Sequence, residues 1–205
     1  MPAILAKKLG MTQRFLDDGR VERMTVLQAG PCPVTAIRTL ERDGYEAVQL
    51  AFGACKEKSL TRPELGHLKK AGASAHRHVV EFRDEAGELL VGDTVTADAF
   101  SPGDKVKVSA TSKGKGFQGT IKRHNFKRGP KSHGSHNVRA PGSIGASATP
   151  SRVFKGIRGP GRMGGGRITQ RGLTVIDVVA QENLLLVRGA VPGPRGGTVE
   201  VRSNG

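Results

Sequence analysis

The residues of this sequence that point most clearly to a chemical role are its lysines and arginines. Sixteen Lys and Arg residues, and no Asp or Glu, lie within residues 105–176, whereas the rest of the chain carries 17 basic and 18 acidic residues. The formal net charge of +15 is therefore concentrated in one internal third of the 205 residues. Such a block repels itself unless an external polyanion neutralises it. These residue types predict the binding of phosphate groups.

Fifteen residues of this acid-free block are predicted to contact a polynucleotide. The cationic members displace counterions from phosphates, and a glycine lets the backbone approach a phosphate closely. They are Lys113, Lys115, Gly116, Lys122, Arg123, Lys127, Arg128, Lys131, Arg139, Arg152, Lys155, Arg158, Arg162, Arg167 and Arg171.

A glycine-rich motif inside the block offers a different chemistry. Residues Gly114–Gly119 fit the pattern G-x-G-x-x-G of dinucleotide-binding loops. That use requires an acidic residue about 20 positions further on for the ribose, and none occurs before Asp177. A nucleotide-dependent enzyme is therefore an alternative with little support. Close approach of the backbone to phosphates is the preferred interpretation of these glycines.

Three histidines of the block, His124, His133 and His136, raise the question of a metal site or a catalytic base. No Cys or carboxylate lies nearby to complete a metal site, and a Ser-His triad would lack the carboxylate that orients its base. Carboxylate pairs occur only in turn signals, at 17–18 and 84–85. The sequence thus predicts no catalysis, no metal, no cofactor and no small-molecule substrate.

Short strands separated by turns are predicted on both sides of the block. Thr61 is expected to cap one short helix, with Pro63 and Glu64 in its first turn. Turn signals stand at Asp17-Asp18-Gly19 and Arg42-Asp43-Gly44. The fold class is mostly β, with a small antiparallel β-barrel body, one or two short helices, and a long irregular Gly/Arg/Lys-rich extension. Runs with strand patterns lie at 3–9, 20–28, 34–40, 45–52, 78–83, 105–109, 173–180, 184–191 and 198–202.

The acid-free block divides this body in the sequence. Residues 1–111 and 173–205 are predicted to form one discontinuous β-barrel domain, and residues 112–172 an extension inserted between two strands. One short helix is expected within Gly116–His124. A fully extended chain spans about 3.3 Å per residue, so the insert can reach many tens of ångströms. Its anchored ends and interspersed apolar residues favour a segment that becomes ordered around a polyanion over a solvated tail.

Composition also indicates in which compartment the protein resides and which kind of polyanion it binds. Cys32 and Cys55 are far apart and form no metal or redox motif, so both are expected to be reduced in a cytoplasmic protein. No apolar run of 18 residues predicts a membrane span. Aromatic residues make up 4% of the chain and no DNA-recognition helix is evident, so neither a base-stacking platform nor major-groove reading is expected. Folded RNA is preferred, and a nucleoid-type DNA-binding structural protein is the alternative.

Four segments, in order along the chain, resemble one protein family. They read LGMT at 9–12, FSPGDKVKVSATSKGKGFQGTIKRHNF at 100–126, PGSIG at 141–145 and NLLLVRGAVPG at 183–193. These segments resemble the bacterial form of the ribosomal protein L-three family of the large subunit.

The resemblance implies a structural constituent of the large ribosomal subunit with no catalysis of its own. It implies binding near the 3′ end of 23S rRNA, nucleation of subunit assembly, and an extension directed toward the peptidyl transferase centre. Ribosomal proteins L-fourteen and L-nineteen are the implied neighbours. The implied tip of the extension is Gly142, Ser143, Ile144, Gly145 and Ala146.

Two positions depart from the family's pattern. Many bacterial relatives carry a methylated Gln after the Ser-Ile-Gly turn, whereas this chain has Ala146, so no such methylation is expected. An Asp or Asn is usual where Lys107 stands, and the lysine lengthens the acid-free block.

Overall fold

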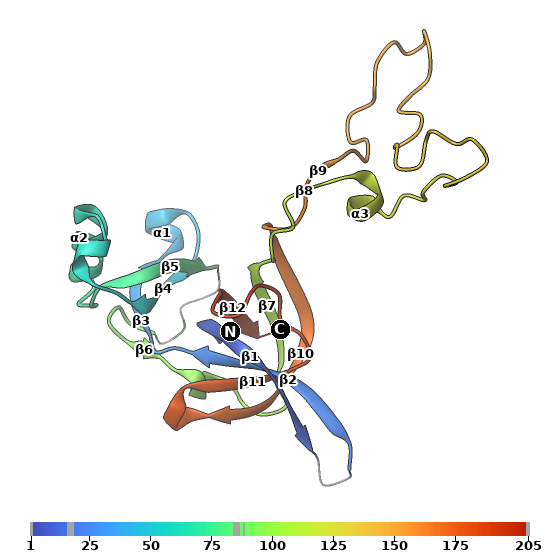
Figure 1. Cartoon of the computed structure of the whole chain (residues 1–205). Coiled ribbons are helices and arrows are strands. Elements are labelled where there is room, and N and C mark those ends of the chain that lie inside the picture. Colours follow the sequence, from blue (N-terminus) through green and yellow to red (C-terminus); the bar gives the residue numbers. More distant parts are fainter. Residues whose placement is uncertain (1, 16–18, 84–86, 88, 204–205) are drawn as a thin grey trace. The chain divides into compact units, whose positions relative to one another are not determined.

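A computed structural model describes residues 2–15, 19–83, 87 and 89–203 in two compact units. The first unit, here called the body, comprises Met1–Ser112 and Arg167–Gly205. The second, here called the inserted unit, comprises Lys113–Gly166 (Figure 1). The sequence prediction had assigned residues 167–172 to the extension, whereas the structure places them in a strand of the body.

The body contains the predicted antiparallel β-barrel, which is confirmed as a closed barrel with the strand order β1-β12-β7-β10-β11-β2. The strands are longer than predicted where their outer residues are exposed, as in the second half of β1 and the first half of β10. The strands are β1 (Ala3–Phe15), β2 (Val21–Ala29), β7 (Lys105–Thr111), β10 (Arg167–Val179), β11 (Leu184–Arg188) and β12 (Thr198–Ser203).

Side-chain alternation fills the barrel. Val106, Val108 and Ala110 of β7 are buried, while Lys105 and Thr111 at its ends are exposed. Val199 and Val201 of β12 are buried in the same way. Burying each such side chain stabilises the fold by about 1.5–3 kcal/mol before the entropy of ordering is counted.

A second sheet packs on the same core, with the strand order β5-β4-β3-β6. The sequence predicted three of its four strands, but neither the short strand at 94–95 nor the separation of this sheet from the barrel. Phe82, Leu50 and Val34 of this sheet share one cluster with barrel residues. The strands are β3 (Cys32–Arg38), β4 (Ala47–Ala54), β5 (His76–Phe82) and β6 (Thr94–Val95), and 3-10 turns follow at η1 (Glu57–Ser59), η2 (Ala97–Ala99) and, in the barrel, η3 (Ala180–Glu182).

The body's two helices test the local signals. Helix α2 (Arg62–Lys70) confirms the predicted capping, because the backbone N–H and hydroxyl of Thr61 both donate to the Glu64 carboxylate at 2.8 Å. The hairpin predicted around 42–44 is confirmed, because β3 pairs antiparallel with β4, but its connection contains the short helix α1 (Leu40–Asp43). Gly44 ends that helix in the left-handed region at φ 76°. The turn residues at 17–18 and 84–85 lie outside the described residues.

The inserted unit has little regular structure. Strand β8 (Phe117–Gln118) pairs with β9 (Gly161–Arg162), and helix α3 spans Thr120–His124. The helix predicted from residue 116 therefore begins four residues late. Gly116 adopts φ 68°, which a right-handed helix excludes, and the next two residues are held by β9.

Candidate nucleic-acid interface

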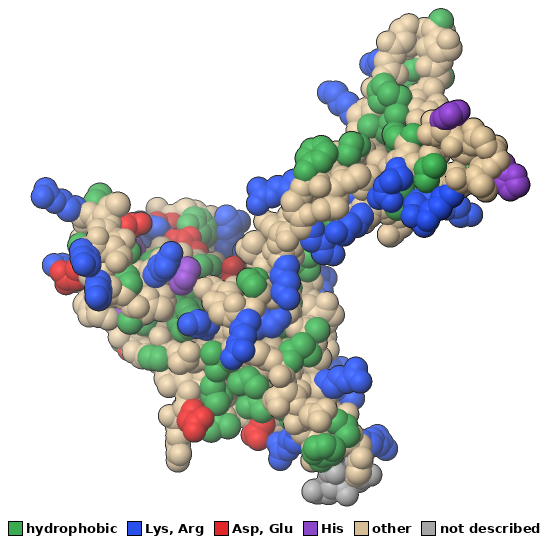
Figure 2. Space-filling view, viewed as in Figure 1, with side chains coloured by type: hydrophobic (Ala, Val, Ile, Leu, Met, Phe, Trp, Pro, Cys, Tyr) green, Lys and Arg blue, Asp and Glu red, His purple; other side chains and the backbone are tan. Residues whose placement is uncertain are grey.

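The cations of the inserted unit face solvent. Residues 113–166 contain twelve Lys and Arg residues and no Asp or Glu. Eleven of the twelve are exposed, and only Arg123 is half-buried. Figure 2 shows these side chains on the visible face of the unit, with no acidic side chain among them. The unit therefore presents a dense positive surface to whatever surrounds it.

This charge is not neutralised within the described part of the chain. Arg123 Nη1 donates to the carbonyl oxygen of Gly159 at 2.8 Å, and the Arg152 guanidinium lies 5.7 Å from the centre of the Phe154 ring. None of the ion pairs between described residues involves residues 113–166. The guanidinium and ammonium groups are thus available to an external anion.

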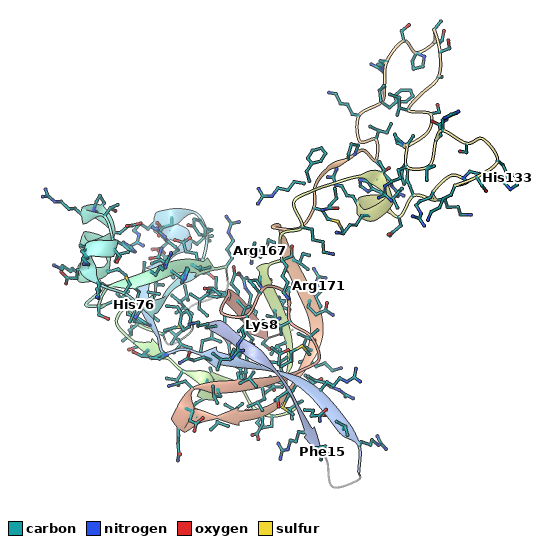
Figure 3. The ribbon with its side chains drawn as sticks, in the orientation of Figure 1. Lys8, Phe15, His76, His133, Arg167 and Arg171 are labelled. Atoms are coloured by element: carbon teal, nitrogen blue, oxygen red, sulfur yellow. The ribbon has the colours of Figure 1, made fainter. Side chains whose placement is uncertain are left out.

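Two predicted contact residues lie on the body instead. Arg167 and Arg171 both belong to β10, on the exposed part of that strand (Figure 3). Arg167 forms an ion pair with the Glu200 carboxylate of β12. Its charge is therefore partly satisfied within the protein, unlike the charges of the inserted unit.

The inserted unit lacks a hydrophobic core. Thr120 is its only buried residue, so side-chain packing does not hold it together. Backbone contacts do this instead, because a Cβ on Gly164 would lie 2.1 Å from the Lys113 carbonyl oxygen and one on Gly129 would lie 2.2 Å from that of Asn137. At these two glycines, two backbone segments of the unit therefore lie closer together than a residue with a Cβ would permit.

The glycine motif at 114–119 is occupied by the unit's own backbone. The Lys115 N–H donates to the Met163 carbonyl at 2.9 Å, and the Met163 N–H donates to the Gly116 carbonyl at 2.9 Å. The helix that follows is only five residues long. These contacts leave fewer free amides for a pyrophosphate than a dinucleotide-binding loop requires.

The histidines of the block serve different local roles. His124 Nε2 lies 3.1 Å from the Gly159 carbonyl oxygen, beside the Arg123 contact. His133 is exposed, with φ 59°. Across the described residues, no group of three or more His, Cys, Asp or Glu side chains is arranged to hold a metal ion.

No helix among the described residues is long and apolar enough to cross a membrane.

The predicted tip, Gly142–Ala146, is fully exposed along its length. Gly142 adopts φ 85°, and the Ser143 hydroxyl donates to the Gly145 carbonyl at 3.1 Å. Ile144 leaves 56% of its surface in solvent. The tip is thus a narrow loop of small residues with one exposed apolar side chain.

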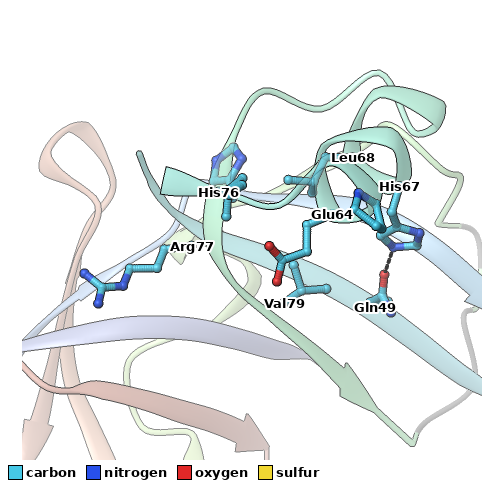
Figure 4. Close-up of a pocket in the computed structure, with 9 residues that line it drawn as sticks. Gln49, Glu64, His67, Leu68, His76, Arg77 and Val79 are labelled. Carbon is cyan, nitrogen blue, oxygen red and sulfur yellow. Dashed lines mark hydrogen bonds between the residues drawn. The ribbon is translucent and has the colours of Figure 1, made fainter. Parts of the chain in front are cut away.

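The body has a cavity of about 440 Å³ between α2 and β5, outside the predicted interface and lined by both polar and apolar side chains (Figure 4). His67 Nε2 lies 2.5 Å from Gln49 Oε1 on its wall, and Gln49 Nε2 donates to Glu81 at 3.1 Å. Glu81 also accepts from the Tyr45 hydroxyl and from Arg38. These contacts join the helix to the sheet, and the partners are mutually satisfied.

Sequence reasoning missed two exposed aromatic rings in the inserted unit. It treated Phe117 and Phe154 as scattered apolar residues, but they leave 76% and 62% of their surface in solvent. For Phe154 the sequence offered a signal, because Arg152 is only two residues away. For Phe117 it offered none, because Arg162 comes to lie opposite the ring only through the pairing of β8 with β9.

Comparison with known proteins identifies the same family that the sequence motifs resemble. Residues 67–184 match a sequence model of the family described as "Ribosomal protein L3". Over 202 residues the chain is 54% identical to "Large ribosomal subunit protein uL3" of Acidothermus cellulolyticus, which covers 98% of this chain and 91% of that protein. It is 52% identical over 200 residues to the protein of the same description from Acaryochloris marina, covering 97% and 94%.

Proposed function

The chain belongs to the ribosomal protein L3 family, and from this premise we propose that its inserted unit is the part that enters folded rRNA. As a member of that family the protein is a structural constituent of the large ribosomal subunit and not an enzyme. It acts in translation, in the cytoplasm where bacterial ribosomes reside. Membership favours this function over a nucleoid-type DNA-binding protein.

The observation that carries the proposal is the exposed, acid-free charge of residues 113–166. Each cation that meets a phosphate releases a condensed counterion, and this release drives binding. The unit has one buried residue and therefore depends on its surroundings for order. Folded rRNA provides both the phosphates and the surrounding surface. The glycines at 129 and 164 keep the chain thin enough to fit between RNA segments.

The finer assignments follow from the family resemblance. The protein binds near the 3′ end of 23S rRNA, nucleates assembly of the subunit, and directs residues 142–146 toward the peptidyl transferase centre. Ribosomal proteins L-fourteen and L-nineteen are its proposed neighbours. The exposure of the whole tip supports its assignment as a contact region.

Cross-linking within assembled subunits tests the proposal. Large subunits that contain this protein are washed at high salt and irradiated, and the cross-linked peptides are identified. Peptides from 113–166 attached to 23S rRNA are the expected result. Loss of the protein in the wash, or cross-links restricted to the body, would contradict it.

A further inference from the structure

We propose that the rings of Phe117 and Phe154 stack on unpaired bases of the rRNA, each beside an arginine that binds a neighbouring phosphate. This inference rests on the proposed function and adds a second kind of contact to it. Charge neutralisation alone is insensitive to base and to strand pairing. Stacking requires a base that is free of its own helix.

The exposure of the two rings is the first observation. In the body, Phe52, Phe82 and Phe100 are at most 8% exposed, as expected for aromatic residues in a core, and Phe15, at the end of β1, is the exposed exception at 70%. Phe117 and Phe154 are 76% and 62% exposed. A phenyl ring in water has no hydrogen bond to make, so two such rings in one small unit point to surfaces that a partner covers.

The backbone of Phe117 lies in a short paired ribbon of the inserted unit. Its strand β8 pairs with β9, and the backbone hydrogen bonds between Lys115, Gly116 and Met163 close the ribbon next to it. This pairing defines which residues of the inserted unit lie beside the ring.

Arg162 stands directly opposite Phe117 in the ribbon and is exposed. Directly opposed residues project from the same face, with Cβ atoms roughly 5 Å apart. The Arg162 guanidinium lies over Gly165, where a Cβ would be 2.9 Å from Nη2. The ribbon therefore presents a ring and a cation side by side, which suits a base and its phosphate.

Phe154 offers the same pair of groups in a different arrangement. The Arg152 guanidinium lies 5.7 Å from the ring centroid, within the range of a cation–π contact. This contact uses one face of the ring and leaves the rest exposed. If a base stacks on the open face of the ring, the negative phosphate of its nucleotide can lie near the arginine.

RNA fits these rings better than a protein does. A protein docked on Phe117 or Phe154 would also bury nearby cations and would have to supply a carboxylate for each, because the inserted unit has none. Phosphates beside the stacked base provide that charge. The low aromatic content of the chain argued against a continuous stacking platform, but two separate rings need only two unpaired bases.

The absence of tryptophan from the chain gives a direct test. Phe117→Trp and Phe154→Trp each introduce one tryptophan into the full-length protein. The emission of each is recorded as 23S rRNA is added, while binding is measured separately by filter retention. Stacking predicts strong quenching that follows the binding curve. Binding with unchanged emission overturns the inference, whereas failure of all proteins, wild type included, to bind rRNA contradicts the proposed function instead.

Affinity separates stacking from simple apolar contact. Phe117→Ala and Phe117→Leu should each weaken rRNA binding by about five- to 150-fold, while Phe117→Tyr keeps it, because only the last retains an aromatic face. The salt dependence should stay unchanged, since no cation is lost. Leu40→Ala, at an exposed apolar position of the body without a ring, is the control and should bind like wild type. Wild-type affinity of Phe117→Leu, or a photo-cross-link from residue 117 to a ribosomal protein, would overturn the inference.

Discussion

Identical residue types have opposite uses in the two units. Lys8 Nζ in the body donates to the carbonyl oxygens of Val191 at 2.6 Å and Gly193 at 3.1 Å, and so fixes the loop that follows β11. The exposed lysines of the inserted unit, such as Lys115, have no such role within the unit. Composition shows only that both are cations, whereas the fold shows that one ammonium group is bonded to the backbone and the other is exposed to solvent.

Replacing Gly164 by alanine should damage the ribbon of the inserted unit. The new Cβ would lie 2.1 Å from the Lys113 carbonyl oxygen, at a φ of 71° that disfavours side chains. Strain of at least about 1–2 kcal/mol is expected, so rRNA affinity should fall about tenfold. Gly166→Ala is the matched control, because nothing lies within 4 Å of its Cβ and its φ is unrestrictive. Equal affinities of the two variants in filter binding would show that the close approach is dispensable.

The two thiols should differ in reactivity. Cys32 is fully buried and its Sγ donates to the Leu5 carbonyl at 3.4 Å, whereas Cys55 is only half-buried. Burial raises the pKa of the Cys32 thiol to about 12, so almost no thiolate forms near neutral pH. A thiol reagent should modify one residue, Cys55, in the native protein and both in denaturant. Mass spectrometry identifies the site, and rapid native labelling of Cys55→Ser would contradict the prediction.

At the scale of elements, prediction succeeded where a local pattern decides the structure. The capping of α2 by Thr61 and Glu64 and the alternation of β7 are local, and both were predicted. The outer part of β10 was missed because residues 167–172 are all exposed and carry no apolar alternation. They are a strand only because β7 lies beside them, with Arg167 opposite Thr111. The two-residue ribbon of β8 and β9 likewise depends on pairing across more than 40 residues of chain.

Glu64, in the first turn of α2, should make the free energy of unfolding depend on pH in the acid range. The backbone and side-chain hydrogen bonds from Thr61 lower the pKa of Glu64 below its usual 4.5. A depressed pKa in the folded state means that the ionised carboxylate stabilises the protein above pH 4.5 and that this contribution is lost as the pH falls through the folded pKa. Glu64→Gln should therefore lower the denaturant midpoint at pH 7 and flatten its decline below pH 4.5.

Equilibrium unfolding in urea across this pH range measures the effect of Glu64. Glu46→Gln, at an exposed position before β4, is the control and should leave both the midpoint and its acid decline close to wild type. A parallel acid decline in Glu64→Gln and wild type would assign the dependence to other carboxylates.

At the scale of the whole molecule, charge and core are segregated between the two units. The body holds the buried cluster that joins the barrel to the second sheet. The inserted unit carries twelve of the 33 basic residues, none of the 18 acidic ones, and one buried residue. This division supports the proposal that the inserted unit becomes ordered in RNA, whereas the body has a core of its own. The acid-free composition predicted this division, but the boundary depended on the pairing of β10 with β7.

Removing the inserted unit should separate folding from phosphate binding. Because Thr111 and Arg167 are paired, joining Thr111 to Arg167 through a two-residue turn would make β7 and β10 a hairpin. The shortened protein should still unfold cooperatively, since the core lies in the body. The slope of log affinity for rRNA against log salt should become shallower by about eight to eleven, if each of the twelve lost cations meets a phosphate. Replacing six of those cations by Gln in the full chain should give about half of that change and controls for chain length. An unchanged slope would locate the phosphate contacts on the body, and loss of cooperative unfolding would show that the body needs the inserted unit to fold.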